Sequence, residues 1–211
     1  EHDSILKKHI FNQQGHIIKH IGDAVFAEFE NINDSISAAI EIQKELKHRN
    51  KISRGKNKIN IRIGLHYGHV IEKENDLFGH DVNICARIEG HAFIGGIAIS
   101  NQALNKAQID NYFTRSYGHV KLKNISQAIE IFKIYTDKDD FLSENVDSFN
   151  RYIQNKGMSI VDIDSYVEEN IISISPLYPQ NLGSSSDDFF CYSFLEQILS
   201  DLRKVNSLRI P

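Results

Sequence analysis

The chain has 211 residues, of which 41% are hydrophobic and 25% charged, a balance typical of globular proteins with one or two domains. With 24 basic and 28 acidic residues, its formal charge is −4, which gives no general reason to expect a nucleic acid partner. The two cysteines, Cys85 and Cys191, are too few and too far apart for a disulfide framework or a paired-cysteine metal site. We therefore expect a reducing, cytoplasmic compartment.

The sequence shows no segment suited to a membrane. A membrane-spanning helix needs about 20 consecutive apolar residues, whereas the longest apolar run, 92–99, is short and interrupted by two glycines. The chain begins EHDSILKKHI, without an initiator methionine and without the apolar core of a signal peptide. We therefore expect no membrane segment, and we expect the chain to be a fragment of a longer protein.

Hydrophobic periodicity predicts alternating helices and strands over the first two thirds of the chain. In chain order, the pattern predicts a helix over 4–14, strands over 16–21 and 24–29, a helix from Asn33 or Asp34 to His48, strands over 59–65 and 69–71, a helix over 80–92, a strand over 97–100, a helix over 101–109, and strands over 112–118, 119–124 and 129–135. A tight turn at Gly22 and Asp23 predicts that the first two strands form a hairpin. Antiparallel hairpins with helices between them indicate an α+β fold.

Charge divides the chain near residue 137. Residues 1–136 carry 18 basic and 15 acidic side chains, whereas residues 137–211 carry 6 and 13, and the change falls at a cluster of three aspartates. We therefore expect a first domain over 1–136, a linker over 137–170 and part of a second domain over 171–211.

Two segments carry polar side chains whose spacing suits a ligand. Asn83 and Arg87 are four residues apart on a predicted helix, so their side chains leave the same face one turn apart. Asp76 lies seven residues before Asn83, with a glycine between them where the chain can turn sharply. These three side chains can converge on one ligand. In the other segment, Lys19 and Asp23 flank the tight turn of the predicted hairpin.

Each segment can also be interpreted without a ligand, and spacing alone does not decide between the two interpretations. A Gly-Asp turn is common in solvated loops, and Asn83 with Arg87 suits an ordinary surface pair. Lys123, in a predicted hairpin, carries no signal by itself. The basic segment 47–58 has six lysines and arginines but no aromatic residue to stack on bases, so we expect a solvated connector and no nucleic acid partner.

Motifs of several other enzyme classes are absent from the sequence. The ten histidines form no HExxH pattern and have no cysteine partner nearby, so we expect no zinc site. Neither GxxxxGK[ST] nor GxGxxG occurs, which excludes the P-loop and Rossmann interpretations.

Five segments follow one another along the first part of the chain: IIKHIGDAVFAEF (17–29), INIRIGLHYGHVI (59–71), DLFGHDVNICARIE (76–89), GGIAIS (95–100) and HVKLKNISQAIEIFKIY (119–135). Their order and spacing resemble the class III adenylate/guanylate cyclase catalytic domain, over residues 4–136. The resemblance implies a ferredoxin-like α+β domain that works as a head-to-tail homodimer. It also implies ATP bound between the two protomers, with two Mg²⁺ or Mn²⁺ ions held by two aspartates.

The resemblance implies that Lys19 and Asp76 select the purine. An ammonium can donate to the ring N1 of adenine, and a carboxylate can accept from its exocyclic amino group. Guanine presents the opposite pattern at that edge, and guanylate cyclases of this family usually carry Glu and Cys at the two positions. The pair therefore favours ATP as the substrate and cyclic AMP with pyrophosphate as the products.

The remaining candidates also match family positions. Asn83 matches the asparagine that orients the ribose for attack of the 3′-hydroxyl on the α-phosphorus, a positioning role. Arg87 matches the arginine that stabilises charge on the α-phosphate in the transition state. Lys123 matches the lysine that contacts the phosphates of ATP. Asp23 matches one of the two metal-binding aspartates.

One element of the family pattern is missing. In the family, a first strand of the form F-x-D-I-x-G-F-T carries the other metal-binding aspartate, and this chain begins after it. Asp3 is no substitute, since it precedes a helical segment without a glycine-rich turn. We therefore expect this chain alone to be inactive and the protein it comes from to be an adenylate cyclase. The alternative is a degenerate cyclase-like module that binds nucleotide or regulates a partner. A diguanylate cyclase or polymerase-palm protein is disfavoured, because no GG[DE]EF-like turn occurs.

The last part of the chain has a pattern of its own. A strand is expected over 169–177 and a helix from Asp187 or Asp188, with apolar residues on one face. Residues 173–210 are similar to the opening of the TolB-like domain that follows cyclase domains in some bacterial proteins. Since one strand and one helix cannot bury their own apolar faces, we expect this part to be an incomplete domain.

Overall fold

The computed structural model describes residues 1–53, 57–74, 76–162, 172–173 and 208–209. The chain forms two compact units, Glu1–Tyr166 and Val167–Pro211. The first unit combines helices with antiparallel and parallel strands, which confirms the α+β fold class. In the described part of the chain, no helix is long and apolar enough to cross a membrane.

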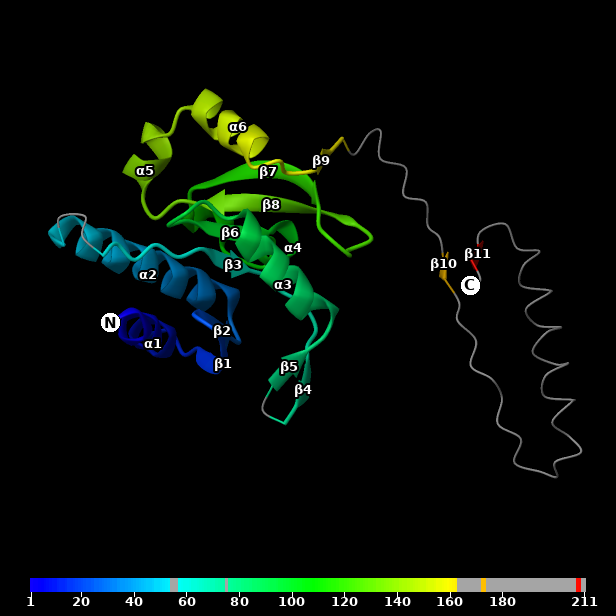
Figure 1. Cartoon of the computed structure of the whole chain (residues 1–211), viewed down its shortest axis with the longest axis horizontal. Helices are drawn as coiled ribbons and strands as arrows, with labels where there is room; N and C mark the ends of the chain where they lie inside the picture. Colours follow the sequence, from blue (N-terminus) through cyan, green and yellow to red (C-terminus); the bar gives the residue numbers. More distant parts are fainter. Residues whose placement is uncertain (54–56, 75, 163–171, 174–207, 210–211) are drawn as a thin grey trace, which may run out of the picture. The chain divides into compact units, whose positions relative to one another are not determined.

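Figure 1 labels the elements of the first unit in chain order. Its helices are α1 (His2–Asn12), α2 (Ile32–Ile52), α3 (His80–His91), α4 (Asn101–Leu104), a 3₁₀ turn (Ile109–Asn111), α5 (Lys138–Ser143) and α6 (Val146–Asn155). Its strands are β1 (His16–Ile21), β2 (Ala24–Glu28), β3 (Ile63–Leu65), β4 (Ile71–Lys73), β5 (Asp76–Phe78), β6 (Ile97–Ser100), β7 (Thr114–Lys121), β8 (Ala128–Ile134) and β9 (Ile160–Val161).

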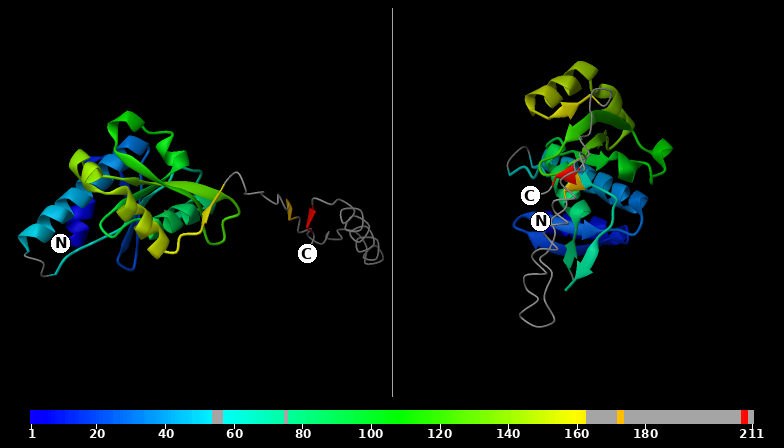
Figure 2. Two further views of the ribbon diagram at one scale, coloured as in Figure 1. Left: turned by 90° about the horizontal axis from the view of Figure 1, so that it is seen from above. Right: turned by 90° about the vertical axis from the view of Figure 1, so that its right-hand side faces the viewer.

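Helices α1 and α2 lie side by side (Figures 1 and 2). Ile5, Leu6 and Ile10 of α1 pack against Ile42 and Leu46 of α2, and all five side chains are buried. The apolar positions recur at helical spacing, so each helix presents one continuous apolar stripe to the other. Removal of these side chains from water holds the two helices together.

The hairpin of β1 and β2 forms as predicted, with the strands antiparallel. Gly22 lies in its turn at φ +63°, where a side chain would be strained. Gly15 precedes β1, and a Cβ atom placed there would lie 2.3 Å from the ring of Phe29. The base of the hairpin therefore depends on a glycine at residue 15.

The central sheet has the strand order β3-β6-β8-β7-β9, in which β3 and β6 run parallel and the other neighbours antiparallel. Alternate residues of β6 face opposite sides of this sheet. Ile97 and Ile99 pack with Ile36 of α2, whereas Ala98 packs with Ile88 of α3. Helix α2 therefore covers one face of the sheet, and α3 covers the other.

Some predicted elements have different bounds in the structure. Helix α2 continues to Ile52, and the helix predicted over 101–109 ends at Leu104. The strand predicted over 69–71 shares only Ile71 with β4, which pairs with β5, a strand that the sequence pattern does not predict. The two strands predicted over 112–118 and 119–124 are largely the single strand β7, with an irregularity at Gly118.

The linker predicted over 137–170 is wrong for its described part, 137–162, where α5, α6 and β9 form. Asp137 caps α5, since its side chain accepts a hydrogen bond from a backbone N–H in the first turn, and β9 pairs with β7. Phe149 and Ile153 of α6 are 2% and 8% exposed and belong to the core beneath the sheet. Helix capping and an apolar pair one turn apart therefore make this segment part of the first unit.

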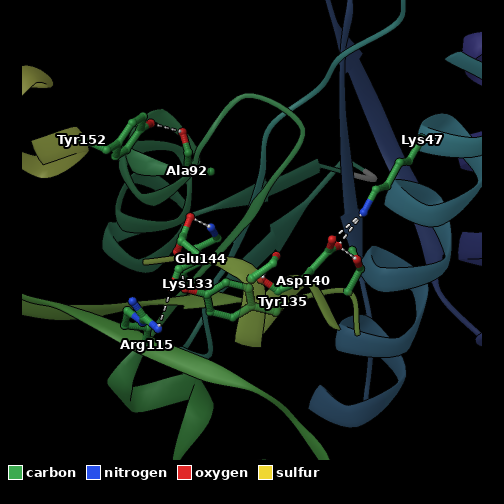
Figure 3. Close-up of polar contacts among 10 residues, drawn as sticks. Lys47, Ala92, Arg115, Lys133, Tyr135, Asp140, Glu144 and Tyr152 are labelled. Carbon is green, nitrogen blue, oxygen red and sulfur yellow. Dashed lines mark hydrogen bonds and ion pairs between the residues drawn. The ribbon is translucent and has the colours of Figure 1, made fainter. Parts of the chain in front are cut away.

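Polar side-chain contacts also join residues 137–162 to the rest of the first unit (Figure 3). Asp140 of α5 pairs with Lys47 of α2 at 2.6 Å. Glu144, between α5 and α6, pairs with Lys133 of β8 at 2.6 Å. The hydroxyl of Tyr152 on α6 donates to the carbonyl oxygen of the residue that follows α3, at 3.1 Å. Helices α5 and α6 are thus joined to α2, to the sheet and to the end of α3.

In the second unit, the described residues form β10 (Ile172–Ser173), which pairs parallel with β11 (Leu208–Arg209). Strand β10 falls within the strand predicted over 169–177. The helix predicted from Asp187 or Asp188, and most of the TolB-like pattern, lie outside the described residues.

Candidate functional site

Lys19 and Asp76 are 57 residues apart in the sequence, and the fold brings their side chains into contact. The Lys19 Nζ atom donates to Asp76 Oδ2 at 2.6 Å. Lys19 projects from β1 and Asp76 begins β5, so the contact joins the two hairpins. The Lys19 and Asp76 side chains are 34% and 27% exposed, which leaves the pair open to a ligand.

Polar and aromatic groups surround this pair. The hydrogen bond from Lys19 is the main reason why the pKa of Asp76 is lowered, and a 2.8 Å hydrogen bond from the Leu77 backbone N–H acts in the same direction. The Lys19 ammonium also lies 5.5 Å from the ring centroid of Phe78 and 6.0 Å from that of Phe26. A donor and an acceptor therefore lie side by side next to aromatic rings.

Helix α3 presents Asn83 and Arg87 on its exposed face. Ile84 and Ile88 of the same helix are buried against the sheet, at 5% and 0% exposure. Asn83 and Arg87 lie one turn apart on the opposite side and are exposed. An amide and a guanidinium are thereby held on a rigid element that begins two residues after β5.

Asp23 and Lys123 both lie in turns. Asp23 is exposed at the tip of the β1–β2 hairpin, and Lys123 is exposed in the turn between β7 and β8. Asp23 is the residue that matches a metal-binding aspartate, but among the described residues no group of three or more His, Cys, Asp or Glu side chains could hold a metal ion.

The structure brings only part of the predicted site together. Within the described residues, Lys19 and Asp76 contact each other, whereas Asn83, Arg87, Asp23 and Lys123 make no side-chain hydrogen bond or ion pair with them. Among the described residues, the Lys19–Asp76 ion pair is therefore the contact that joins two of the predicted site residues.

A polar cluster of His66, Ser100 and Asp81, which was not predicted from the sequence, lies between α3 and the end of β6. The ring of His66 lies between Ser100, at 2.8 Å, and Asp81 of α3, at 3.4 Å. The position of Asp81 in the first turn of a helix, after a glycine, was a signal for an anchoring carboxylate. Its partner His66, one of ten scattered histidines, carried no pattern that would distinguish it.

The comparisons with known proteins agree on one family. A family model described as the adenylate and guanylate cyclase catalytic domain matches residues 1–136. A Rhizobium meliloti protein named "Putative adenylate cyclase 3" is 27% identical over 197 residues, which cover 92% of this chain and 31% of that protein. The chain spans about a third of the length of the first curated relatives it matches.

Solved structures show the same fold. An adenylate/guanylate cyclase/hydrolase from Silicibacter pomeroyi is 28% identical, with a TM-score of 0.59 over 63% of this chain and 79% of that one. The adenylyl cyclase CyaB from P. aeruginosa is 20% identical, with a TM-score of 0.54 over 66% of this chain and 81% of that one.

Proposed function

Because the chain belongs to the adenylate and guanylate cyclase catalytic domain family, we propose that it forms the substrate-binding half of an adenylate cyclase site. The reaction converts ATP to 3′,5′-cyclic AMP and pyrophosphate. The observation that carries the proposal is the contact between Lys19 and Asp76. No other ion pair among the described residues joins two of the residues that match the family's site.

The Lys19–Asp76 pair supports adenine rather than guanine. At its Watson–Crick edge, adenine offers one acceptor, N1, and one donor, the amino group, and an ammonium beside a carboxylate complements both. The 2.6 Å contact places the two groups close enough for one base edge to reach both, after they separate to admit it. Phe78, 48% exposed next to the pair, offers an aromatic surface for the base.

Asn83 and Arg87 support a role at the ribose and the phosphates. In the reaction, the 3′-hydroxyl loses its proton to water as its oxygen bonds to the α-phosphorus. The bond from that phosphorus to the oxygen that bridges the α- and β-phosphates breaks, and pyrophosphate leaves with the electron pair of that bond. Asn83 would hold the ribose so that the 3′-hydroxyl is in line for attack. Arg87 would donate to the α-phosphate oxygens, where negative charge develops. Lys123 would contact the other phosphates.

Divalent metal ions in this family lower the pKa of the 3′-hydroxyl and neutralise the leaving group. Asp23, exposed at the tip of the β1–β2 hairpin, would contribute its carboxylate to holding Mg²⁺ or Mn²⁺.

We also propose a head-to-tail homodimer as the active form. Ile21, Ile71 and Phe78 lie on β1, β4 and β5 and are 59%, 67% and 48% exposed. Exposed apolar side chains around a candidate site favour contact with a second protein surface. In such a dimer, Asp23 of one protomer would face α3 of its partner. Mixing Asp23→Ala and Arg87→Ala forms of the full-length protein should then restore activity that neither form has alone.

Exchange of the purine-selecting pair tests the proposal. In the full-length protein, Lys19→Glu combined with Asp76→Cys should shift the ratio of kcat/KM for ATP and GTP toward GTP by at least about tenfold. Lys51→Glu, at an exposed lysine on α2, is the matched control for the change of charge. An unchanged ratio in the double variant would remove the adenine assignment.

The second candidate function is a nucleotide-binding regulatory module. The contact between Lys19 and Asp76 is the observation that favours it, since recognition of a base by this pair requires no metal ion. A full-length protein that binds ATP, with Lys19→Glu weakening the binding, but makes no cyclic nucleotide with Mg²⁺ or Mn²⁺ would establish this alternative.

A further inference from the structure

The carboxylate of Asp81, in the first turn of α3, is enclosed by the loop that follows β3. Its Oδ2 atom accepts a hydrogen bond from the His69 backbone N–H at 2.6 Å, and its Oδ1 atom lies 3.4 Å from Nε2 of His66. A Cβ atom on Gly68 would lie 2.2 Å from this carboxylate. The loop therefore closes around the carboxylate only because residue 68 has no side chain.

The ring of His66 continues this contact into the sheet. Its Nδ1 atom lies 2.8 Å from the hydroxyl of Ser100 at the end of β6, and that hydroxyl also accepts from the Ala103 backbone N–H at 3.2 Å. One arrangement of protons satisfies every group: the Ser100 hydroxyl donates to Nδ1, and Nε2–H donates to Asp81. A line of hydrogen bonds then runs from α4 through His66 to α3.

The His66 side chain is only 2% exposed, so it is part of the interior. Burial is the main reason why its pKa is lowered, and the neighbouring His80 acts in the same direction, while Asp81 opposes both. The ring is therefore neutral near pH 7, as the proton arrangement above requires. Ser100 is fully buried, so a substrate cannot reach it. Ser100, His66 and Asp81 therefore do not form a nucleophilic triad.

Two further contacts hold α3 on β3, both on the face that carries Asp81. The Sγ atom of Cys85 donates to the Gly64 carbonyl oxygen at 3.5 Å. A Cβ atom on Gly64 would lie 2.4 Å from the Glu89 backbone nitrogen, so strand and helix approach each other closely here. These contacts lie opposite the exposed face with Asn83 and Arg87.

We propose that His66 is a positioning residue that acts through Asp81 to fix α3 on the sheet and so sets the orientation of Asn83 and Arg87. This inference rests on the proposed function for its effect on the reaction. His66 does not touch the substrate. The expected consequence of losing it is a helix that docks less firmly and a reaction that slows because the two side chains are misplaced.

The first test measures the docking of α3 without any activity. In the 211-residue chain with Cys191→Ser, Cys85 is the remaining cysteine, and the rate at which a thiol reagent modifies it reports exposure of the α3–β3 contact. His66→Leu and Asp81→Asn should each raise this rate about tenfold, as expected for the loss of one buried hydrogen bond. His66→Gln, which keeps a donor for Asp81, should restore part of the protection.

His69→Ala is the matched control, because it removes an exposed imidazole and leaves the backbone N–H that binds Asp81. Its modification rate should equal that of the parent chain. Equal rates in His66→Leu, Asp81→Asn and the control would overturn the anchoring role of His66. Circular dichroism of each variant separates faster modification from loss of the fold.

The second test measures the reaction in the full-length protein. His66→Leu should lower kcat by about 10- to 100-fold with KM for ATP changed less than threefold, which is the pattern of lost positioning. An unchanged kcat would overturn the role in positioning Asn83 and Arg87. A wild-type protein without cyclase activity would instead contradict the proposed function, and Cys85 modification alone would then decide whether His66 anchors α3.

Discussion

Replacement of Glu144 by alanine should destabilise the first unit by about 3 kcal/mol. Glu144 receives a 2.6 Å hydrogen bond from the Lys133 ammonium and another from the Tyr135 hydroxyl, and the Lys133 and Glu144 side chains are only 13% and 19% exposed. Burial, the largest effect, lowers the pKa of Lys133, and Glu144 opposes that shift. Without Glu144, Lys133 keeps a buried charge and loses its partner.

The magnitude follows from these contacts. Breaking a fully buried ion pair costs about 3–5 kcal/mol, and the remaining exposure of this pair favours a value below that range, about 2 kcal/mol. The hydrogen bond lost by Tyr135 adds about 1 kcal/mol. Lys133→Met combined with Glu144→Ala should recover part of the loss, since neither charge then stays buried without a partner.

The assay is hydrogen exchange of the β8 amides in the 211-residue chain, which measures the free energy of opening in the first unit. Glu41→Ala is the matched control: its ion pair with Lys44 has both side chains 46% exposed, and its loss should cost less than about 0.5 kcal/mol. A loss below about 1 kcal/mol for Glu144→Ala would refute the reasoning that α5 and α6 are packed parts of the first unit.

Two further predictions concern the stability of the same unit. Phe149→Ala should cost about 3–5 kcal/mol, because Phe149 is 2% exposed in the core, and a change of less than 1 kcal/mol in the same exchange experiment would contradict the packing of α6. The free energy of unfolding should fall as the pH decreases from about 7.5 to 5.5, since burial lowers the pKa of both His66 and His91 and the unfolded chain then binds more protons than the folded one. The midpoint of urea unfolding at each pH measures this effect, and a midpoint that stays constant over this range would contradict it.

Local patterns were sufficient to predict elements whose signals lie within a few residues. The β1–β2 hairpin was predicted with nearly its observed bounds, because Gly22 and Asp23 specify the turn directly between two apolar runs. Strand β5 was missed, and the strand predicted over 69–71 overlaps β4 only at Ile71, because three residues are too few to show a period. Strand β7 was divided in two at Gly118, where the glycine marks a bulge at φ +92° and not a break.

The error at 137–162 has a different cause. A cluster of aspartates was interpreted as the start of a linker, although Asp137 also suits a helix cap, the role that it has in the structure. Phe149 and Ile153 are apolar and four residues apart, a spacing that indicates a packed helix after α5. Composition described the charge correctly but could not show which charged residues end a domain and which begin a helix.

The candidate site shows where local reasoning stops. Asn83 and Arg87 could be placed on one helix face from spacing alone. The contact between Lys19 and Asp76 spans 57 residues, so only the resemblance to a family, and no period or turn, indicated that they act together. The contact of His66 with Asp81 was missed because a single buried histidine leaves no pattern in the sequence.

The most direct test of the central claim is the formation of cyclic nucleotides from ATP and from GTP by the full-length protein with Mn²⁺, beside Arg87→Ala and the control Lys51→Ala. We expect cyclic AMP as the main product, a fall in kcat of about 10²- to 10³-fold for Arg87→Ala with ATP binding retained, and no change for Lys51→Ala. Absence of cyclic nucleotide from the wild-type protein, or an Arg87→Ala variant as active as wild type, would contradict the account.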